Sequence, residues 1–278
     1  MPKPLVIYHA KCPDGMTAAW AVWKALGDGD YVPATHGDAP PDVAGRDVVI
    51  VDFAYKRAVM QAMAAAAKSL LVLDHHKSAQ ADLEGLPFAV FDMGRSGAGM
   101  AWDRFHPGQP RPALVDLVED NDLWRHALRG AREFHLRLEM ENMDFACWDR
   151  VAGMQATELD AYIAEGALLK RAFDGEVHAL LEDRYAVTLA GEPGLAVNAS
   201  GKYSSELGHH LAAISGSFGM VWRQLDGALK ISLRSCGDYD VALLAGKFGG
   251  GGHRNAASFT LPVNAQAYAL VAGRALAQ

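Results

Sequence analysis

Short apolar runs alternate with Ala-rich segments through the first half of the chain. Runs of Leu, Val, Ile and Phe of this length are typical of strands buried on both faces, and the Ala-rich segments are long enough for helices. The predicted strands are residues 4–9, 47–52, 69–73 and 88–92, and the predicted helices are residues 15–26 and 56–67. This alternation predicts a parallel sheet flanked by helices.

The pattern changes after Pro112. From there to about Arg184 the chain is predicted to be helical, and because its last part lacks Pro we interpret that part as a bridging helix. Strands return beyond it, and Asp226-Gly227 is a strong signal for a hairpin turn. The predicted strands are residues 185–190, 194–198, 218–225, 228–235 and 256–261, followed by an Ala-rich helix.

The sequence therefore predicts two α/β domains. We expect a parallel-sheet domain over residues 1–155, a helical linker over 156–184 and a smaller mixed α/β domain over 185–278.

Composition and charge narrow the class of protein. The 278 residues are 50% apolar and 21% charged, which is typical of a globular chain. A net charge of −7 argues against binding of long duplex DNA, because such binding depends on Lys and Arg. There is no apolar run of the roughly 18–20 residues that a membrane span needs. The three cysteines lie far apart and do not form a disulfide framework, so we expect a soluble, cytoplasmic protein.

Acidic and histidine side chains stand where the predicted strands end. The strands end at His9, Asp52 and Asp74. Because the carboxyl ends of parallel strands meet at one edge of a sheet, we expect these side chains to lie close together. Buried carboxylates without a counter-charge are costly, and a divalent cation is the simplest compensation. Further candidates in the adjoining loops are Cys12, Asp14, His75 and His76.

A fourth acidic cluster lies in residues 117–124, LVEDNDLW. It carries Glu119, Asp120 and Asp122 between apolar flanks that tie it to the core. An inward-facing carboxylate here would add to the same site. The mixed set of oxygen and imidazole donors suits Mn²⁺ better than a closed structural zinc site.

Together these motifs resemble the DHH phosphoesterase superfamily, in its two-domain form with a C-terminal DHHA1 domain. The resemblance spans nearly the whole chain. It is carried by HAKCPDG at 9–15, Asp52, Asp74-His75-His76, Asp120 in VEDND, ISLRS at 231–235 and GGGGHRNAASF at 249–259.

The resemblance implies a site for two divalent cations, usually Mn²⁺, with Mg²⁺ as the alternative. Asp74 and His76 are the implied catalytic residues, and His76 would face the scissile phosphate rather than a metal. Asp122 is the alternative to Asp120 as a ligand. The implied metal ligands are His9, Cys12, Asp14, Asp52, Asp74, His75 and Asp120.

Cys12 departs from the family pattern, which usually has an aspartate at this position. Three interpretations stay open. The thiol could be a soft ligand that changes the metal preference, it could leave the first metal weakly held, or it could simply pack at a helix start.

The second half carries an implied substrate-binding set. Glycines without a Cβ let backbone N–H groups approach an anion closely, and an Arg side chain suits bidentate contact with phosphate. The predicted residues are Arg234, Gly250, Gly251, Gly252, His253 and Arg254.

These observations predict a metal-dependent hydrolase that acts on short oligonucleotides or small nucleotide phosphoesters. The alternatives are a polyphosphate or 3′-phosphoadenosine 5′-phosphate phosphohydrolase, or a nucleotide-binding sensor with weakened catalysis. The expected partner is a short nucleotide substrate, without long duplex DNA or a membrane, and the sequence is also compatible with a homodimer.

Overall fold

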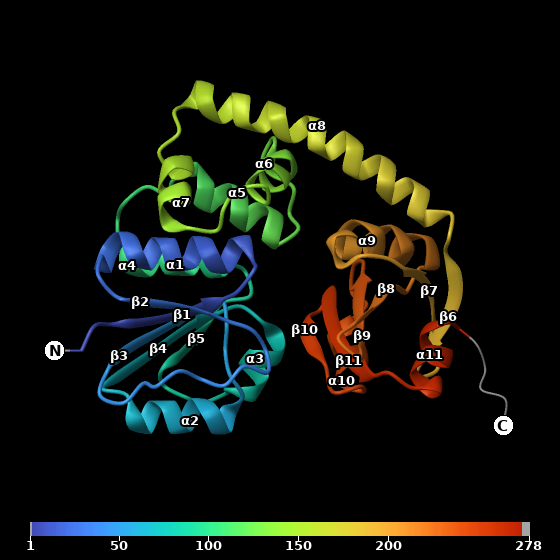
Figure 1. Ribbon diagram of the computed structural model, residues 1–278, viewed down its shortest axis with the longest axis horizontal. Coiled ribbons are helices and arrows are strands. Elements are labelled where there is room, and N and C mark those ends of the chain that lie inside the picture. Colours follow the sequence, from blue (N-terminus) through green and yellow to red (C-terminus); the bar gives the residue numbers. More distant parts are fainter. Residues whose placement is uncertain (1, 274–278) are drawn as a thin grey trace. The chain divides into compact units, whose positions relative to one another are not determined.

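The computed structural model describes residues 2–273 and divides into two compact units, Met1–Arg171 and Ala172–Gln278 (Figure 1). Helix α8 (Ala156–Leu181) crosses this division, and at 26 residues it coincides with the predicted bridging helix. Within residues 2–273, no helix combines the length and the apolar content that a bilayer span requires. The two-domain α/β architecture expected from the sequence is confirmed.

The first unit is built on a five-stranded parallel sheet with the order β2-β1-β3-β4-β5. One face packs against α1 and α4, which are covered in turn by α5, α6 and α7, and the other face packs against α2 and α3 (Figure 1). The strands are β1 (Leu5–His9), β2 (Asp30–Ala34), β3 (Asp47–Val51), β4 (Ser69–Asp74) and β5 (Ala89–Phe91). The helices are α1 (Pro13–Leu26), α2 (Arg57–Ala66), α3 (Lys77–Asp82), α4 (Gly97–Phe105), α5 (Ala113–Asp122), α6 (Ala131–Leu138) and α7 (Phe145–Ala152).

All four strands predicted for the first half are present, and β2 is an additional strand that the sequence pattern missed. Pro33 lies within β2, and a proline normally argues against a strand because it lacks an N–H donor. At the edge of the sheet this donor is not needed, so β2 can pair with β1 alone.

The second unit contains a six-stranded mixed sheet with the order β10-β11-β9-β8-β7-β6. Helix α9 and the end of α8 pack on one face, and α10 and α11 pack on the other. Its elements are β6 (Tyr185–Leu189), β7 (Glu192–Asn198), η1 (Gly201–Tyr203), α9 (Ser204–Ser215), β8 (Phe218–Leu225), β9 (Ala228–Ser235), α10 (Val241–Gly246), β10 (Gly251–His253), β11 (Ala256–Pro262) and α11 (Ala265–Val271).

The hairpin predicted at Asp226-Gly227 is confirmed. Strands β8 and β9 pair in antiparallel fashion up to Leu225 and Ala228. The two residues between them have φ angles of 48° and 76°, as a tight turn with two left-handed residues requires.

Candidate metal centre

Three adjacent strands of the first unit deliver polar side chains to the same edge of the sheet. β3 pairs with both β1 and β4, so the ends of these strands lie side by side. His9 is the last residue of β1, Asp74 is the last residue of β4, and Asp52 directly follows β3. Asp52 and Asp74 are buried, at 1% and 0% exposure. The expected convergence at the carboxyl edge is therefore present.

Three sets of side chains at this edge have donor atoms within 4.8 Å of one another. Asp52 belongs to two of these sets. Its Oδ1 also forms a hydrogen bond of 3.1 Å with Nε2 of His75, and this bond connects Asp52 to the third set. The sets are His9, Cys12 and Asp52; Asp14, His75 and Asp122; and Asp52, Asp74 and His76.

Asp52 adopts a strained backbone conformation. Its φ of 54° lies in the left-handed region, which costs free energy in a residue other than Gly. Its N–H donates to the carbonyl of Leu73 at 2.9 Å, which anchors the strained residue to β4. Oδ2 of Asp52 is buried without a hydrogen bond among the described residues, and Nδ1 of His9 lies 3.5 Å away.

Asp14 is held by the first turn of α4. Gly97 N–H donates to its Oδ2 at 2.7 Å, and Ala98 N–H donates to its Oδ1 at 3.0 Å. Burial and the neighbouring charges of Asp52 and Asp122 nevertheless raise the pKa of Asp14 well above its usual value. The carboxylates at this edge therefore repel one another, and a cation would relieve that repulsion.

His75 lies between three carboxylates. Its Nε2 is 3.1 Å from Asp52, 3.5 Å from Asp122 and 3.6 Å from Asp14. Burial alone would lower the pKa of this imidazole, but the hydrogen bond with Asp52 and the nearby negative charges raise it to about 10. Without a cation, His75 is therefore protonated at neutral pH and supplies part of the missing positive charge.

His76 is oriented by its neighbour Asp74. Nδ1 of the ring lies 2.7 Å from Oδ1 of Asp74. Burial would lower the pKa of His76, but the charge of Asp74 and this hydrogen bond raise it to about 9. The His76 ring is thus a proton donor at neutral pH.

The donor set fits divalent cations. Oδ2 of Asp52 and Oδ2 of Asp74 are both buried without a hydrogen bond among the described residues. Buried oxygens of this kind are costly unless a ligand compensates them. A mixed set of carboxylate oxygens and imidazole nitrogens suits Mn²⁺, Fe²⁺, Co²⁺ or Zn²⁺.

The acidic end of α5 differs from the expectation in one respect. The sequence favoured Asp120 as the ligand, but the carboxylate of Asp120 accepts the backbone N–H groups of Ala127 at 3.0 Å and Leu128 at 3.3 Å. Asp122 instead lies near His75. Residues two apart in a helix point to different faces, so only one of the two carboxylates can face the site. The sequence does not show which face that is, and the path of the chain after α5 decides between them.

His36 is a neighbour of the site that the sequence analysis did not single out. Its ring lies 6.0 Å from that of His9 and 5.1 Å from that of Phe53. Burial, together with the charges of His9 and His76, lowers the pKa of His36. Because His36 follows the missed strand β2, no periodic signal placed it at this edge.

In the second unit, the predicted substrate-binding residues cluster around β9 and β10. The Arg234 guanidinium donates to the Leu233 carbonyl at 2.9 Å and to Oγ of Ser205 at 3.1 Å. Arg254 pairs with the exposed Asp238 at 2.8 Å. His253 ends β10, which pairs with β11.

The glycines before His253 have a clear structural requirement. A Cβ at Gly250 would lie 2.1 Å from the Ser258 carbonyl, and one at Gly252 would lie 2.5 Å from the Ala256 carbonyl. The close approach of β10 to β11 therefore explains two of these glycines without a ligand.

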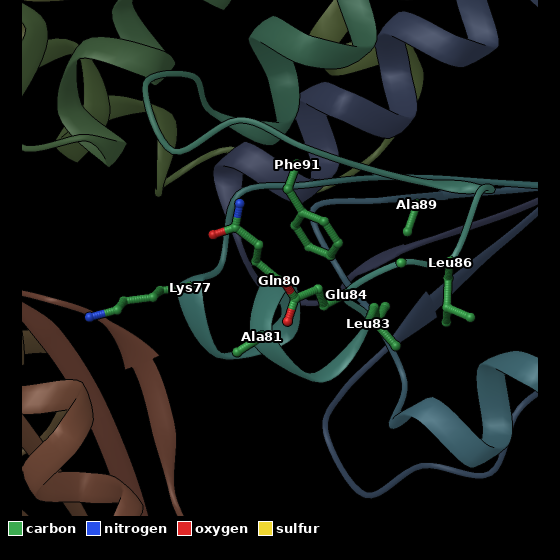
Figure 2. Close-up of a pocket in the computed structure, with 9 residues that line it drawn as sticks. Lys77, Gln80, Ala81, Leu83, Glu84, Leu86, Ala89 and Phe91 are labelled. Carbon is green, nitrogen blue, oxygen red and sulfur yellow. The ribbon is translucent and has the colours of Figure 1, made fainter.

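A pocket of about 490 Å³ lies between α3 and the edge strand β5 of the first sheet (Figure 2). Phe91 contributes its ring to this pocket and pairs in register with Asp74 of the metal centre. Gln80 of α3 lies beside that ring. The pocket is lined by Lys77, Gln80, Ala81, Leu83, Glu84, Gly85, Leu86, Ala89 and Phe91.

Two curated proteins are similar to this chain over part of their length, and no protein-family profile matches it. Uncharacterized protein R106 of Acanthamoeba polyphaga mimivirus is 28% identical over 289 residues, covering 91% of this chain and 66% of that protein. The cyclic-di-AMP phosphodiesterase GdpP of Geobacillus thermodenitrificans is 24% identical over 189 residues, covering 67% of this chain and 29% of that protein. The chain thus spans less than two thirds of GdpP and just under two thirds of the mimivirus protein.

Two solved structures share the fold. RecJ of Thermus thermophilus, in complex with Mn²⁺, matches with a TM-score of 0.54 at 16% identity, over 97% of this chain and 50% of that one. The second structure is the DHH domain of a protein described as a member of the s1p family of ribosomal proteins. It matches with a TM-score of 0.57 at 14% identity, over 98% of this chain and 85% of that chain. The chain shares the fold of these two structures, one of which is described as a DHH domain, and this confirms the fold that the resemblance implied.

Proposed function

We propose that this protein is a metal-dependent phosphoesterase that hydrolyses short oligonucleotides or small nucleotide phosphoesters. One observation carries the proposal: two sets of potential ligands, His9/Cys12/Asp52 and Asp14/His75/Asp122, are joined through the contact between Asp52 and His75. The similarity to a cyclic-di-AMP phosphodiesterase and the shared fold with Mn²⁺-bound RecJ support the same class.

Each of the two sets would hold one divalent cation, and the contact between Asp52 and His75 connects the sets. Bound divalent cations supply Lewis-acid stabilisation of a phosphoryl group and acidify water. Asp14 and Asp52 would offer their carboxylates from fixed positions, because Asp14 accepts hydrogen bonds from the N-terminus of α4 and the backbone of Asp52 is anchored to β4.

His76 donates a proton or hydrogen bond to the phosphoryl group. Asp74 holds Nδ1 of the ring, so the ring presents its Nε2 side to substrate in a fixed orientation. The raised pKa, about 9, keeps this imidazole protonated at neutral pH. A protonated group aimed at a developing oxyanion is worth several kcal/mol of transition-state stabilisation.

The pocket between α3 and β5 accommodates a nucleoside of the substrate. Phe91 offers an aromatic face on which a base can stack, and Gln80 offers an amide that can pair with a base edge. The pairing of Phe91 with Asp74, which joins the pocket to one residue of the metal centre, supports this assignment. We further propose that Arg234 of the second unit binds an anionic group of the substrate.

The proposal is tested by hydrolysis assays with Mn²⁺ on the linear dinucleotide pApA, 3′-phosphoadenosine 5′-phosphate and polyphosphate. We expect turnover of at least one nucleotide substrate by the wild type and none by Asp52→Asn. Turnover of polyphosphate alone would replace the nucleotide assignment. Failure to hydrolyse all three with cations bound would contradict the proposed activity.

A further inference from the structure

The two ligand sets at the sheet edge differ in chemical character. The set Asp14, His75 and Asp122 offers two carboxylates and one imidazole. The set His9, Cys12 and Asp52 offers a thiol in place of one carboxylate. A thiolate is a soft ligand that selects Zn²⁺, Fe²⁺ or Co²⁺, whereas carboxylates suit Mn²⁺ and Mg²⁺.

The backbone directs Cys12 into this set. Lys11 has a φ of 55°, which turns the chain sharply after β1, and Cys12 then occupies the N-cap position of α1. Its thiol thereby lies within 4.8 Å of donor atoms of His9 and Asp52.

The surroundings of Cys12 are those of a ligand rather than of a packed apolar side chain. Burial, followed by the charges of Asp52, Asp122 and Asp14, raises the pKa of the Cys12 thiol well above its usual value. Oδ2 of Asp52, whose side chain is only 2% exposed, is buried without a hydrogen bond and belongs to the same set. An unsatisfied buried oxygen beside a thiol and an imidazole is the environment of a cation site.

We propose that the metal centre is asymmetric: His9, Cys12 and Asp52 bind a soft or borderline cation such as Zn²⁺, Fe²⁺ or Co²⁺ through a Cys12 thiolate, and Asp14, His75 and Asp122 bind a harder cation such as Mn²⁺. This inference rests on the metal centre of the proposed function, and it adds the identity of the cations. Cys12 therefore determines the metal preference of one subsite.

The test uses Co²⁺ as the probe, because a cobalt–thiolate bond gives a charge-transfer absorption band in the near ultraviolet that carboxylate and imidazole ligands do not give. Metal-free full-length protein is titrated with Co²⁺, and the same titration is made with Cys12→Ser, Cys12→Asp and Cys147→Ser. Cys147, in α7, has its thiol bound to Glu141 at 3.0 Å and is the matched control.

We expect the band in the wild type and in Cys147→Ser, and its loss in both Cys12 variants. Competition between Zn²⁺ and Mn²⁺ should shift by at least about tenfold towards Mn²⁺ in Cys12→Asp, which restores a hard ligand set. A Co²⁺-loaded wild type without the band, or a band that persists in Cys12→Ser, would overturn the inference.

The outcome is separable from that of the proposed function. A charge-transfer band that depends on Cys12, in a protein that hydrolyses no phosphoester, would sustain the ligand assignment and refute the activity. If the Co²⁺-loaded protein hydrolyses a dinucleotide but lacks the band, the proposed activity stands and the Cys12 ligand assignment is refuted. Circular dichroism of Cys12→Asp shows whether the variant is folded.

Discussion

The backbone N–H of Gly97 donates a hydrogen bond to Oδ2 of Asp14 at 2.7 Å, and it thereby joins the start of α4 to a carboxylate 83 residues earlier in the chain. The partial positive charge at a helix N-terminus favours this carboxylate. The same contact explains the glycine, because a Cβ on Gly97 would lie 2.4 Å from Cβ of Asp52 and 3.0 Å from Oδ2 of Asp14. One residue therefore sets the spacing of two potential ligands.

Substitution Gly97→Ala should damage the metal centre. The added methyl group must displace Asp52 or Asp14, so we expect metal affinity to fall by about 10–100-fold, the range observed when the support of a ligand is removed. Isothermal titration with Mn²⁺ measures the change.

The matched control is Gly175→Ala in α8. A Cβ at Gly175 meets no atom within 4 Å, and alanine favours a helix over glycine by up to about 1 kcal/mol. This variant should bind metal as the wild type does and be at least as stable. Equal metal affinity in Gly97→Ala and Gly175→Ala would refute the steric argument.

Asp122 and Asp120 should respond differently to the same substitution. Asp122→Asn should lower metal affinity by at least about 10–100-fold, because Asp122 is placed among the ligands next to His75. Asp120→Asn should keep the metal but lower the free energy of unfolding by about 1–2 kcal/mol, since its carboxylate accepts two backbone N–H groups. Metal titration and urea unfolding separate the two effects, and the reverse pattern would restore Asp120 as the ligand.

His76 should act on the substrate and not on the metal. We expect His76→Ala to bind divalent cations as the wild type does, while kcat falls by about 10²–10⁴-fold through loss of the proton donor. Steady-state kinetics and metal analysis of the same preparation test this. Loss of bound metal in His76→Ala would place His76 among the ligands instead.

Metal binding should release protons and strengthen with pH. The pKa of His75 is raised to about 10 in the metal-free protein, so its imidazole is protonated at pH 7. A cation needs the neutral imidazole, so binding must expel about one proton from this group, and affinity should rise as pH increases towards 10. Titration calorimetry in buffers with different ionisation enthalpies measures the released protons. Affinity that is independent of pH between about 6 and 9 would contradict a ligand role for His75.

Phe91 and Val90 offer a matched test of the pocket beside the metal centre. Phe91→Ala should raise KM by about tenfold with little change in kcat, because a stacked base contributes about 1–3 kcal/mol to binding. Val90, the preceding residue of β5, is 47% exposed, and its side chain points to the other face of the sheet. Val90→Ala should therefore leave KM unchanged. Equal KM values for Phe91→Ala and Val90→Ala would show that the pocket does not bind the substrate.

Much of the fold followed from the sequence because its signals are local. The apolar runs before His9, Asp52 and Asp74 predict buried strands, and because parallel strands end at one edge of a sheet, they also predict that these three residues meet. Strand β2 was missed because Pro33 contradicts a strand except at the edge of a sheet, and edge position is a property of the whole topology. His36, which follows β2, was missed with it.

The choice between Asp120 and Asp122 depends on contacts that sequence patterns do not contain. Both lie in the last turn of α5. Beyond the helix the chain turns back, and the N–H groups of Ala127 and Leu128 donate hydrogen bonds to the Asp120 carboxylate. The glycines before His253 show another limit of sequence patterns. The prediction that they form an anion-binding loop stands untested, and the close packing of β10 on β11 adds a structural requirement for Gly250 and Gly252 that the sequence did not reveal.

The most direct test of the central claim is to follow bound cation and turnover together. Metal-free protein is titrated with Mn²⁺ in the presence of pApA, and the same titration is made with Asp122→Asn. The account predicts no turnover without metal, activity that rises with occupancy up to two cations per chain, and little activity in the variant. Hydrolysis by the metal-free protein, or equal turnover by Asp122→Asn and the wild type, would contradict it.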